Sequence, residues 1–206
     1  FIAQEISFDR FHEHSDRIYR MYVDGNIGDQ DFKGAWTSYT MAPSLAREME
    51  SIEKFVRVEM IAQQLVWHEN VKVVEETIIY ADSSFFEIFS INLLHGDPLA
   101  VLTEPNTIVI TRAKARQYFG VDNPIGESLE FNKDQNYYVV VGVMDEFPEN
   151  SHFFCDMMIS MSSLPESRSD DWFSNSIYSY MLLKPGVDYQ KVELEMNEIM
   201  LVHIRD

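Results

Sequence analysis

The sequence predicts an α+β protein. The apolar pattern switches repeatedly between a period of two, typical of half-buried strands, and a period of 3.6, typical of amphipathic helices. Hydrophobic residues make up 46% of the 206 residues and aromatic residues 13%, which is enough for a packed core. No segment repeats at a fixed period, and none has low complexity.

The N-terminal stretch ISFDRFHEHSDRIYRMYVDGN predicts a short helix followed by a strand. Phe8, Phe11 and Ile18 are spaced as in a short amphipathic helix. Residues 18–24 follow as a strand, closed by a turn signal, Asp-Gly-Asn, at residues 24–26.

A second helix is expected over residues 42–50. Thr40 is a suitable N-cap residue and Pro43 suits the first turn. Leu45 and Met49 are four positions apart, so they share one face of this helix.

Later segments alternate between apolar and polar residues or are rich in β-branched residues, and they predict further strands. The expected strands are residues 55–67, 70–81, 128–132, 137–144, 153–161 and 176–184. Residues 70–81 form one or two strands. The strands 128–132 and 137–144 form a hairpin through a turn around Asp134 and Asn136. Pro185 and Gly186 then turn the chain into a helix over 188–203. One stripe of that helix carries Val192, Met196, Ile199, Met200 and His203.

The segment YADSSFFEIFSINLLHGDP, residues 80–98, predicts a two-turn helix that anchors itself through aromatic side chains. Ser84 and Glu87 fit a capping box, with Asp82 as an alternative cap one step earlier. The phenylalanines at 85, 86 and 89 fall on one side. A ligand pocket is the alternative use of these rings, but an aromatic stripe at helical spacing more often buries itself.

The segment NTIVITRAKARQYFG predicts a short buried strand over 107–110 that runs into a helix. Thr111 caps this helix and Gly120 closes it. Its three cations are Arg112, Lys114 and Arg116. They form either a docking patch for an acidic partner or, as we favour, a helix with a basic exposed face on which Arg112 and Arg116, four positions apart, point to water.

The order of these elements predicts two interleaved subdomains. A strand–helix–strand unit lies near each end of the chain, at residues 18–64 and 153–203. A more β-rich block, about 82–150, lies between them. This arrangement lets both chain ends emerge from the same subdomain.

Charge and cysteine content exclude several classes of protein. The formal net charge of −18 repels phosphate backbones and anionic lipid headgroups, so nucleic acid is not an expected partner. With Cys155 as the only cysteine, an intrachain disulfide is impossible. No stretch approaches the roughly 20 apolar residues that span a bilayer. Because the chain begins with Phe1 rather than methionine, we expect a segment of a larger protein.

No catalytic, cofactor or metal site is predicted. His12 and His14 flank Glu13, but on a helix residues two apart diverge, and we expect a solvated polar face. Cys155 lies in an apolar segment where a thiol is usually an inert core residue, and on a strand it would face away from His152. Phosphate-binding loops and a nucleophile elbow are missing from the sequence.

The order of several motifs resembles the periplasmic core domain of MacB/FtsX-type ABC transporter permeases, especially large permeases of Bacteroidetes. The motifs are ISFDRFHEHSDRIYRMY, YADSSFFEIFSINLLHGDPLAVLTEPNTIVITRAKARQYFG, NPIGESLEFN, YYVVVGVMDEFPENSHFFCDMMISMSSL and YSYMLLKPG. They cover nearly the whole chain. His14 departs from the usual pattern, which tends to have Asn there.

This resemblance implies a domain inserted between the first two transmembrane helices of a permease in the cell inner membrane, facing the periplasm. It implies a porter-like subdomain of two β–α–β halves, here 1–80 and 152–206, with an inserted Sabre-like subdomain, here 81–151. The implied domain is non-catalytic and transmits conformational change from cytoplasmic ATP hydrolysis. The implied partners are a second permease copy or half, a cytoplasmic ATP-binding subunit, and a periplasmic adaptor or substrate.

Two other functions stay open on the residues alone. One is a free-standing periplasmic binding module for a peptide or hydrophobic ligand, which needs a deep apolar cleft. The other is a hydrolase, which needs a cluster of His or carboxylate residues at the base of a cleft. For a permease, efflux, lipoprotein handling and mechanical signalling to a cell-wall enzyme are the alternatives. The permease also requires both termini, Phe1 and Asp206, to leave from one face.

Overall fold

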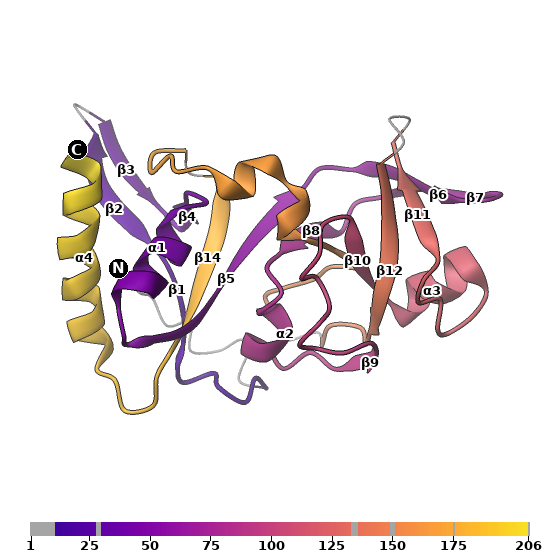
Figure 1. The fold of residues 1–206 in the computed structure, drawn as a ribbon, viewed down its shortest axis with the longest axis horizontal. Helices are drawn as coiled ribbons and strands as arrows, with labels where there is room; N and C mark the ends of the chain where they lie inside the picture. The colour runs from indigo at the N-terminus through magenta and orange to yellow at the C-terminus, as the bar shows by residue number, and fades with distance from the viewer. Residues whose placement is uncertain (1–10, 28–29, 133–135, 149–150, 175, 206) are drawn as a thin grey trace.

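The computed structural model describes residues 11–27, 30–132, 136–148, 151–174 and 176–205. A mixed sheet of twelve strands runs along the long axis of the molecule, and a two-stranded hairpin lies beside it (Figure 1). The helix near the C-terminus lies at one end of the sheet (Figure 1). The α+β prediction is confirmed.

The elements of the fold have the following bounds. The strands are β1 (Ile18–Arg20), β2 (Val23–Ile27), β3 (Gln30–Gly34), β4 (Trp36–Thr37), β5 (Ile52–Ile61), β6 (Gln64–His68), β7 (Val71–Glu75), β8 (Ile78–Ala81), β9 (Leu93–His95), β10 (Thr107–Thr111), β11 (Ser128–Phe131), β12 (Asn136–Met144), β13 (Met157–Ser160) and β14 (Ile177–Leu183). The helices are α1 (Met41–Glu48), α2 (Phe85–Ile88), α3 (Arg112–Phe119) and α4 (Tyr189–Arg205), with 3₁₀ turns η1 (Met161–Ser163) and η2 (Pro165–Arg168).

The order of strands in the large sheet mixes distant parts of the chain. It runs β1, β14, β5, β8, β13, β10, β12, β11, β6 and β7, with β4 also on β14 and β9 also on β12. β13 lies at the middle of this order: it is parallel to β8, with Ile159 beside Tyr80, and antiparallel to β10, with Ile159 beside Ile108. A strand from the last quarter of the chain therefore joins the two halves of the sheet.

Three large clusters of buried side chains pack against this sheet. The first lies under α2 and includes its buried phenylalanines together with residues of β5 and β14. The second lies between α3 and the strands β10 to β13. The third is formed by α1 and α4 against β5 and β14, and Val192 and Met196 belong to it while Ile199 and Met200 pack at its edge. The apolar stripe predicted for the last helix is therefore confirmed.

The predicted N-terminal helix and strand differ from the structure. Residues 11–17 form turns, and residues 1–10 of the expected helix lie outside the described part, as do both chain ends, Phe1 and Asp206. The predicted strand 18–24 is two strands, because the chain leaves β14 after β1 and pairs with β3 instead. The predicted turn at 24–26 is wrong: these residues lie inside β2, where Asp24 aligns with Lys33.

Two long predicted strands are shorter or divided. Residues 55–67 contain β5 and β6, separated at Ala62 and Gln63, because β5 pairs with β8 while β6 pairs with β11. In the predicted strand 153–161, ladder pairing begins only at Met157. The residues before it still alternate, with Cys155 1% exposed and Phe154 63% exposed. The alternation of apolar and polar residues therefore predicted correctly which side chains are buried. It did not show that residues 153–156 lack a neighbouring strand in the ladder.

The remaining predicted elements agree with the structure within a few residues. The helix predicted at 42–50 is α1, although the Thr40 side chain makes no capping hydrogen bond. Strands β11, β12 and β14 correspond to the expected ones, and the hairpin turn falls on residues 133–135, outside the described part. For α3, Thr111 accepts a hydrogen bond from the backbone N–H of Lys114, and Gly120 closes the helix in the left-handed conformation at a φ of 70°.

Candidate functional site: the clamped junction of the sheet

One arginine connects four segments of the chain beside the place where β8 meets β13. Arg57 lies in β5 between Val56 and Val58, which are fully buried in the first core. Because side chains alternate along a strand, Arg57 projects to the other face of β5. There it meets Asp82, which directly follows β8.

The guanidinium of Arg57 forms a bidentate ion pair with Asp82. Its Nε donates to Oδ2 at 2.9 Å and its Nη2 donates to Oδ1 at 2.8 Å. The Arg57 backbone N–H also donates to Oδ2, at 2.8 Å. Nη1 donates to the carbonyls of Tyr39, at 3.0 Å, and Ser167, at 2.7 Å. One side chain thus ties together β5, the end of β8, the segment before α1, and η2, with the planar geometry that arginine alone provides.

The aromatic anchor predicted around α2 is present. Phe85, Phe86 and Phe89 are buried, and all three belong to the first core. The ring centroid of Phe89 lies 4.8 Å from that of Phe153 and 5.3 Å from that of Tyr180, both nearly edge-on. The rings therefore serve packing, and α2 is fixed to strand β14 and to the segment before β13.

The predicted capping box of α2 is wrong. The Ser84 hydroxyl donates to the carbonyl of Phe55 in β5 instead of accepting from its own helix. Glu87 forms an ion pair with Lys54, also in β5, at 2.7 Å. Asp82, the alternative cap, is occupied by Arg57. Since α2 has only one turn, these side chains stabilise it through tertiary contacts with the sheet.

A second ionic cluster lies under α3. Lys114 Nζ lies 2.5 Å from Glu75 Oε2 and 3.7 Å from Asp156 Oδ2. The Tyr118 hydroxyl donates to the other Glu75 oxygen at 2.7 Å. Burial, together with the hydrogen bond to Glu75, raises the pKa of Tyr118. The side chains of Glu75 and Lys114 are 4% and 14% exposed, so this cluster is largely shielded from water.

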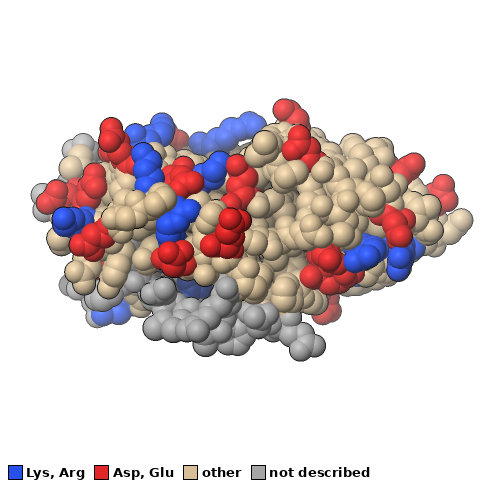
Figure 2. All heavy atoms as spheres, turned by 90° about the horizontal axis from the view of Figure 1, so that it is seen from below, with Lys and Arg blue, Asp and Glu red and all other residues tan. Residues whose placement is uncertain are grey.

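The three cations of α3 do not form a basic patch. Lys114 points inward, toward Glu75 and Asp156. Arg112 pairs with Asp145 at 2.7 Å, and the guanidinium lowers the pKa of that carboxyl. Arg116 is exposed and pairs with Asp122. Acidic and basic side chains are likewise interspersed on the face of the molecule drawn in Figure 2.

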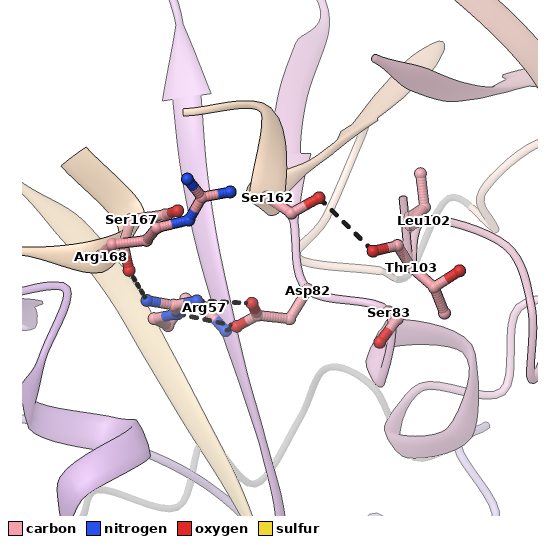
Figure 3. A pocket seen from close by; sticks show the side chains of 8 residues that line it. All are labelled: Arg57, Asp82, Ser83, Leu102, Thr103, Ser162, Ser167 and Arg168. Atoms are coloured by element: carbon pink, nitrogen blue, oxygen red, sulfur yellow. Dashed lines mark hydrogen bonds and ion pairs between the residues drawn. The ribbon is translucent and has the colours of Figure 1, made fainter. Parts of the chain in front are cut away.

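A pocket lies beside the Arg57–Asp82 pair (Figure 3). Its volume is about 270 Å³. It is lined by Arg57, Asp82, Ser83, Leu102, Thr103, Ser162, Ser167 and Arg168. The wall is polar and comes from five separate segments. Sequence reasoning missed this site, since Arg57 and Asp82 are 25 residues apart and Arg57 is one of several charged residues in its strand.

The other candidate residues lie apart from this pocket. His12 is buried, not solvated as expected, and its Nδ1 lies 3.0 Å from the backbone nitrogen of Ser90, which donates to it. Cys155 is fully buried, and desolvation raises the pKa of its thiol. Nε2 of His152 lies 3.0 Å from the Tyr180 hydroxyl.

Within the described ranges, no group of three or more His, Cys, Asp or Glu residues could hold a metal ion. In the same part of the chain, no helix has both the length and the apolar character needed to cross a membrane.

Several solved structures share this fold. A domain of a protein described as a permease from Porphyromonas gingivalis has a TM-score of 0.78 at 22% identity, over 93% of this chain and 86% of that one. The periplasmic region of MacB from Actinobacillus actinomycetemcomitans has a TM-score of 0.67 at 14% identity, over 96% and 86%. The extracellular domain of the noncanonic ABC-type transporter YknZ from Gram-positive bacteria has a TM-score of 0.52 at 13% identity, over 72% and 74%.

At these identities the solved structures show a shared fold, and a comparison with curated protein sequences gives no match. The sequence pattern of the MacB-like periplasmic core domain matches residues 2–199. This match covers every strand described above and the helices α1, α2 and α3 completely, and it covers α4 up to residue 199. The chain therefore belongs to the family of MacB-like periplasmic core domains of ABC transporter permeases.

Proposed function

We propose that this domain is a non-catalytic relay of a permease in the cell inner membrane. It transmits conformational change, driven by ATP hydrolysis on a cytoplasmic subunit, to a substrate or a periplasmic adaptor. It acts beside a second permease copy or half. The observation that carries this proposal is the Arg57 clamp, because a relay has to move as a unit and packed, clamped elements move as rigid bodies.

The proposal includes two subdomains, residues 1–80 with 152–206 and residues 81–151. Asp82 belongs to the second, while Tyr39, Arg57 and Ser167 belong to the first. The clamp therefore crosses the proposed boundary at the three hydrogen bonds that Arg57 donates to the Asp82 carboxylate. The Ser84 hydroxyl and the Lys54–Glu87 ion pair cross the same boundary. These contacts support motion of the two subdomains as one body.

Spin-label distances in the full permease with its ATP-binding subunit test this proposal. Cys155→Ala removes the native thiol, and Gln117→Cys on α3 with Gln190→Cys on α4 supplies two exposed sites at opposite ends of the domain (Figure 1). We expect the distance within one domain to stay constant when ATP is added. The distance between the Gln117→Cys labels of two copies should change.

A clamp variant and a matched control sharpen this experiment. Asp82→Asn should broaden the intradomain distance distribution, because it removes the charge that faces Arg57. Asp122→Asn removes a carboxylate from the exposed pair with Arg116 and should leave the distribution unchanged. An intradomain distance that shifts with ATP in the otherwise unmodified clamp would contradict the relay.

A further inference from the structure

We propose that the pocket beside the clamp binds an oxyanion, a carboxylate or phosphate group, and that Arg168 is its main ligand. This goes beyond the relay function and does not depend on it. The charge balance of the pocket wall differs from that of the chain as a whole, which is strongly acidic.

Arg168 is the arginine of the pocket that has no internal partner. Within the described part of the chain, its exposed side chain forms no hydrogen bond or ion pair, whereas Arg17, Arg112 and Arg116 each pair with a carboxylate. Figure 3 shows the guanidinium of Arg168 at the border of the pocket. Its donors are therefore available to a ligand.

The only carboxylate among the lining residues does not compete for Arg168. Asp82 accepts three hydrogen bonds from Arg57, so its negative charge is already compensated. Two arginines and one aspartate give this wall a formal charge of +1. A positive wall within a strongly acidic surface selects for an anion.

The remaining wall supplies neutral hydrogen-bonding groups. Ser83 lies across the pocket from Arg168 in Figure 3, and in the described structure its hydroxyl has no partner. The hydroxyl of Ser162 donates to the carbonyl of Thr103, at a distance of 3.5 Å. A guanidinium on one side and a hydroxyl on the other provide donors for two oxygens of one bound group.

Hydrogen bonds within the protein hold two walls of the pocket in place. Leu102 is held in the left-handed backbone region at a φ of 60°, and its carbonyl accepts a hydrogen bond from the buried hydroxyl of Ser160 at 2.7 Å. Arg57 fixes the opposite wall through the Ser167 carbonyl. A volume of about 270 Å³ suits a small anion or the charged end of a larger molecule.

Titration of this 206-residue chain with inorganic phosphate, and separately with acetate, at constant ionic strength set by chloride, tests the proposal. The readout is the shift of amide and arginine side-chain NMR signals. We expect saturable shifts at Ser83, Thr103 and the side-chain N–H of Arg168. The anion that binds more tightly identifies the ligand as a phosphate or a carboxylate.

Three variants decide whether the binding belongs to this pocket. Arg168→Ala should weaken it about ten- to hundredfold, the range for hydrogen bonds to a charged group. Arg168→Lys should weaken it less, since it keeps the charge and loses the planar fork. Lys191→Ala removes an exposed cation on α4 and should have no effect. Shifts that do not saturate, or an equal response in Arg168→Ala and Lys191→Ala, would overturn the proposal.

Discussion

The aromatic anchor makes the sharpest prediction about stability. Phe89 is 1% exposed, and its ring centroid lies within 5.3 Å of those of Phe85, Phe153 and Tyr180. Phe89→Ala removes buried apolar surface and leaves a cavity among aromatic rings that cannot easily collapse. Such truncations reduce the free energy of unfolding by about 3–5 kcal/mol.

The expected change in thermal stability follows from the size of the chain. For domains of this length, each kcal/mol lowers the midpoint by about 2–4 °C. Phe89→Ala should therefore lower the melting temperature by roughly 6–20 °C. Urea titration followed by circular dichroism gives the free energy of unfolding directly, provided that the slope with denaturant is unchanged.

Phe154 provides a matched control in the same protein. It has the same side chain and lies next to Phe153 in sequence, but it is 63% exposed. Phe154→Ala should change the free energy of unfolding by less than about 0.5 kcal/mol. Similar effects of Phe89→Ala and Phe154→Ala on the free energy of unfolding would show that burial of the rings does not fix α2.

Three further predictions concern charge, backbone and ionisation. Lys114→Ala should lower the free energy of unfolding by about 3 kcal/mol in urea titrations, because it leaves Glu75 buried without its cation. Arg116→Ala, which breaks an exposed ion pair, should cause no measurable change. Equal effects of the two substitutions would contradict the role of burial. Gly120→Ala should lower the free energy of unfolding by about 1–2 kcal/mol, because Gly120 has a φ of 70° that alanine adopts only under strain. Gly25→Ala should have no such effect, because Gly25 also lies in open space but has no positive φ. A Gly120→Ala variant as stable as the original chain would refute the left-handed conformation of Gly120. Because burial raises the pKa of Cys155, the folded chain keeps a thiol proton that the unfolded chain loses at alkaline pH, so stability falls as pH rises above the ordinary thiol pKa. Urea midpoints at pH 7 and pH 10 should differ less in Cys155→Ala, and an unchanged difference would count against it.

Local signals in the sequence were sufficient to predict a helix or strand where residues close in the sequence stabilise it. The strand–helix unit from 107 to 120 is an example: Thr111 caps α3 and Gly120 supplies the left-handed residue that ends it. The stripe of α4 and the aromatic face of α2 were equally predictable, because helical spacing places those side chains on one side whatever they pack against.

Prediction failed where an element depends on a distant strand. Residues 24–26 carry a strong turn signal, yet they form part of β2 because Asp24 pairs with Lys33 across the hairpin. The sequence of the helix alone gave no indication of the carboxylate that Lys114 binds. Lys114 points inward because β7 brings Glu75, 39 residues earlier in the chain, beneath α3.

The sequence by itself determined the α+β class, most of the helices and strands, and the resemblance to an extracytoplasmic permease domain that the family match confirms. Only the tertiary structure decided which strands are neighbours, and with them the clamp and the pocket. Arg57 and the Ser167 carbonyl are 110 residues apart in the chain. No local periodicity encodes such a contact, because it exists only once β13 has been inserted between β8 and β10.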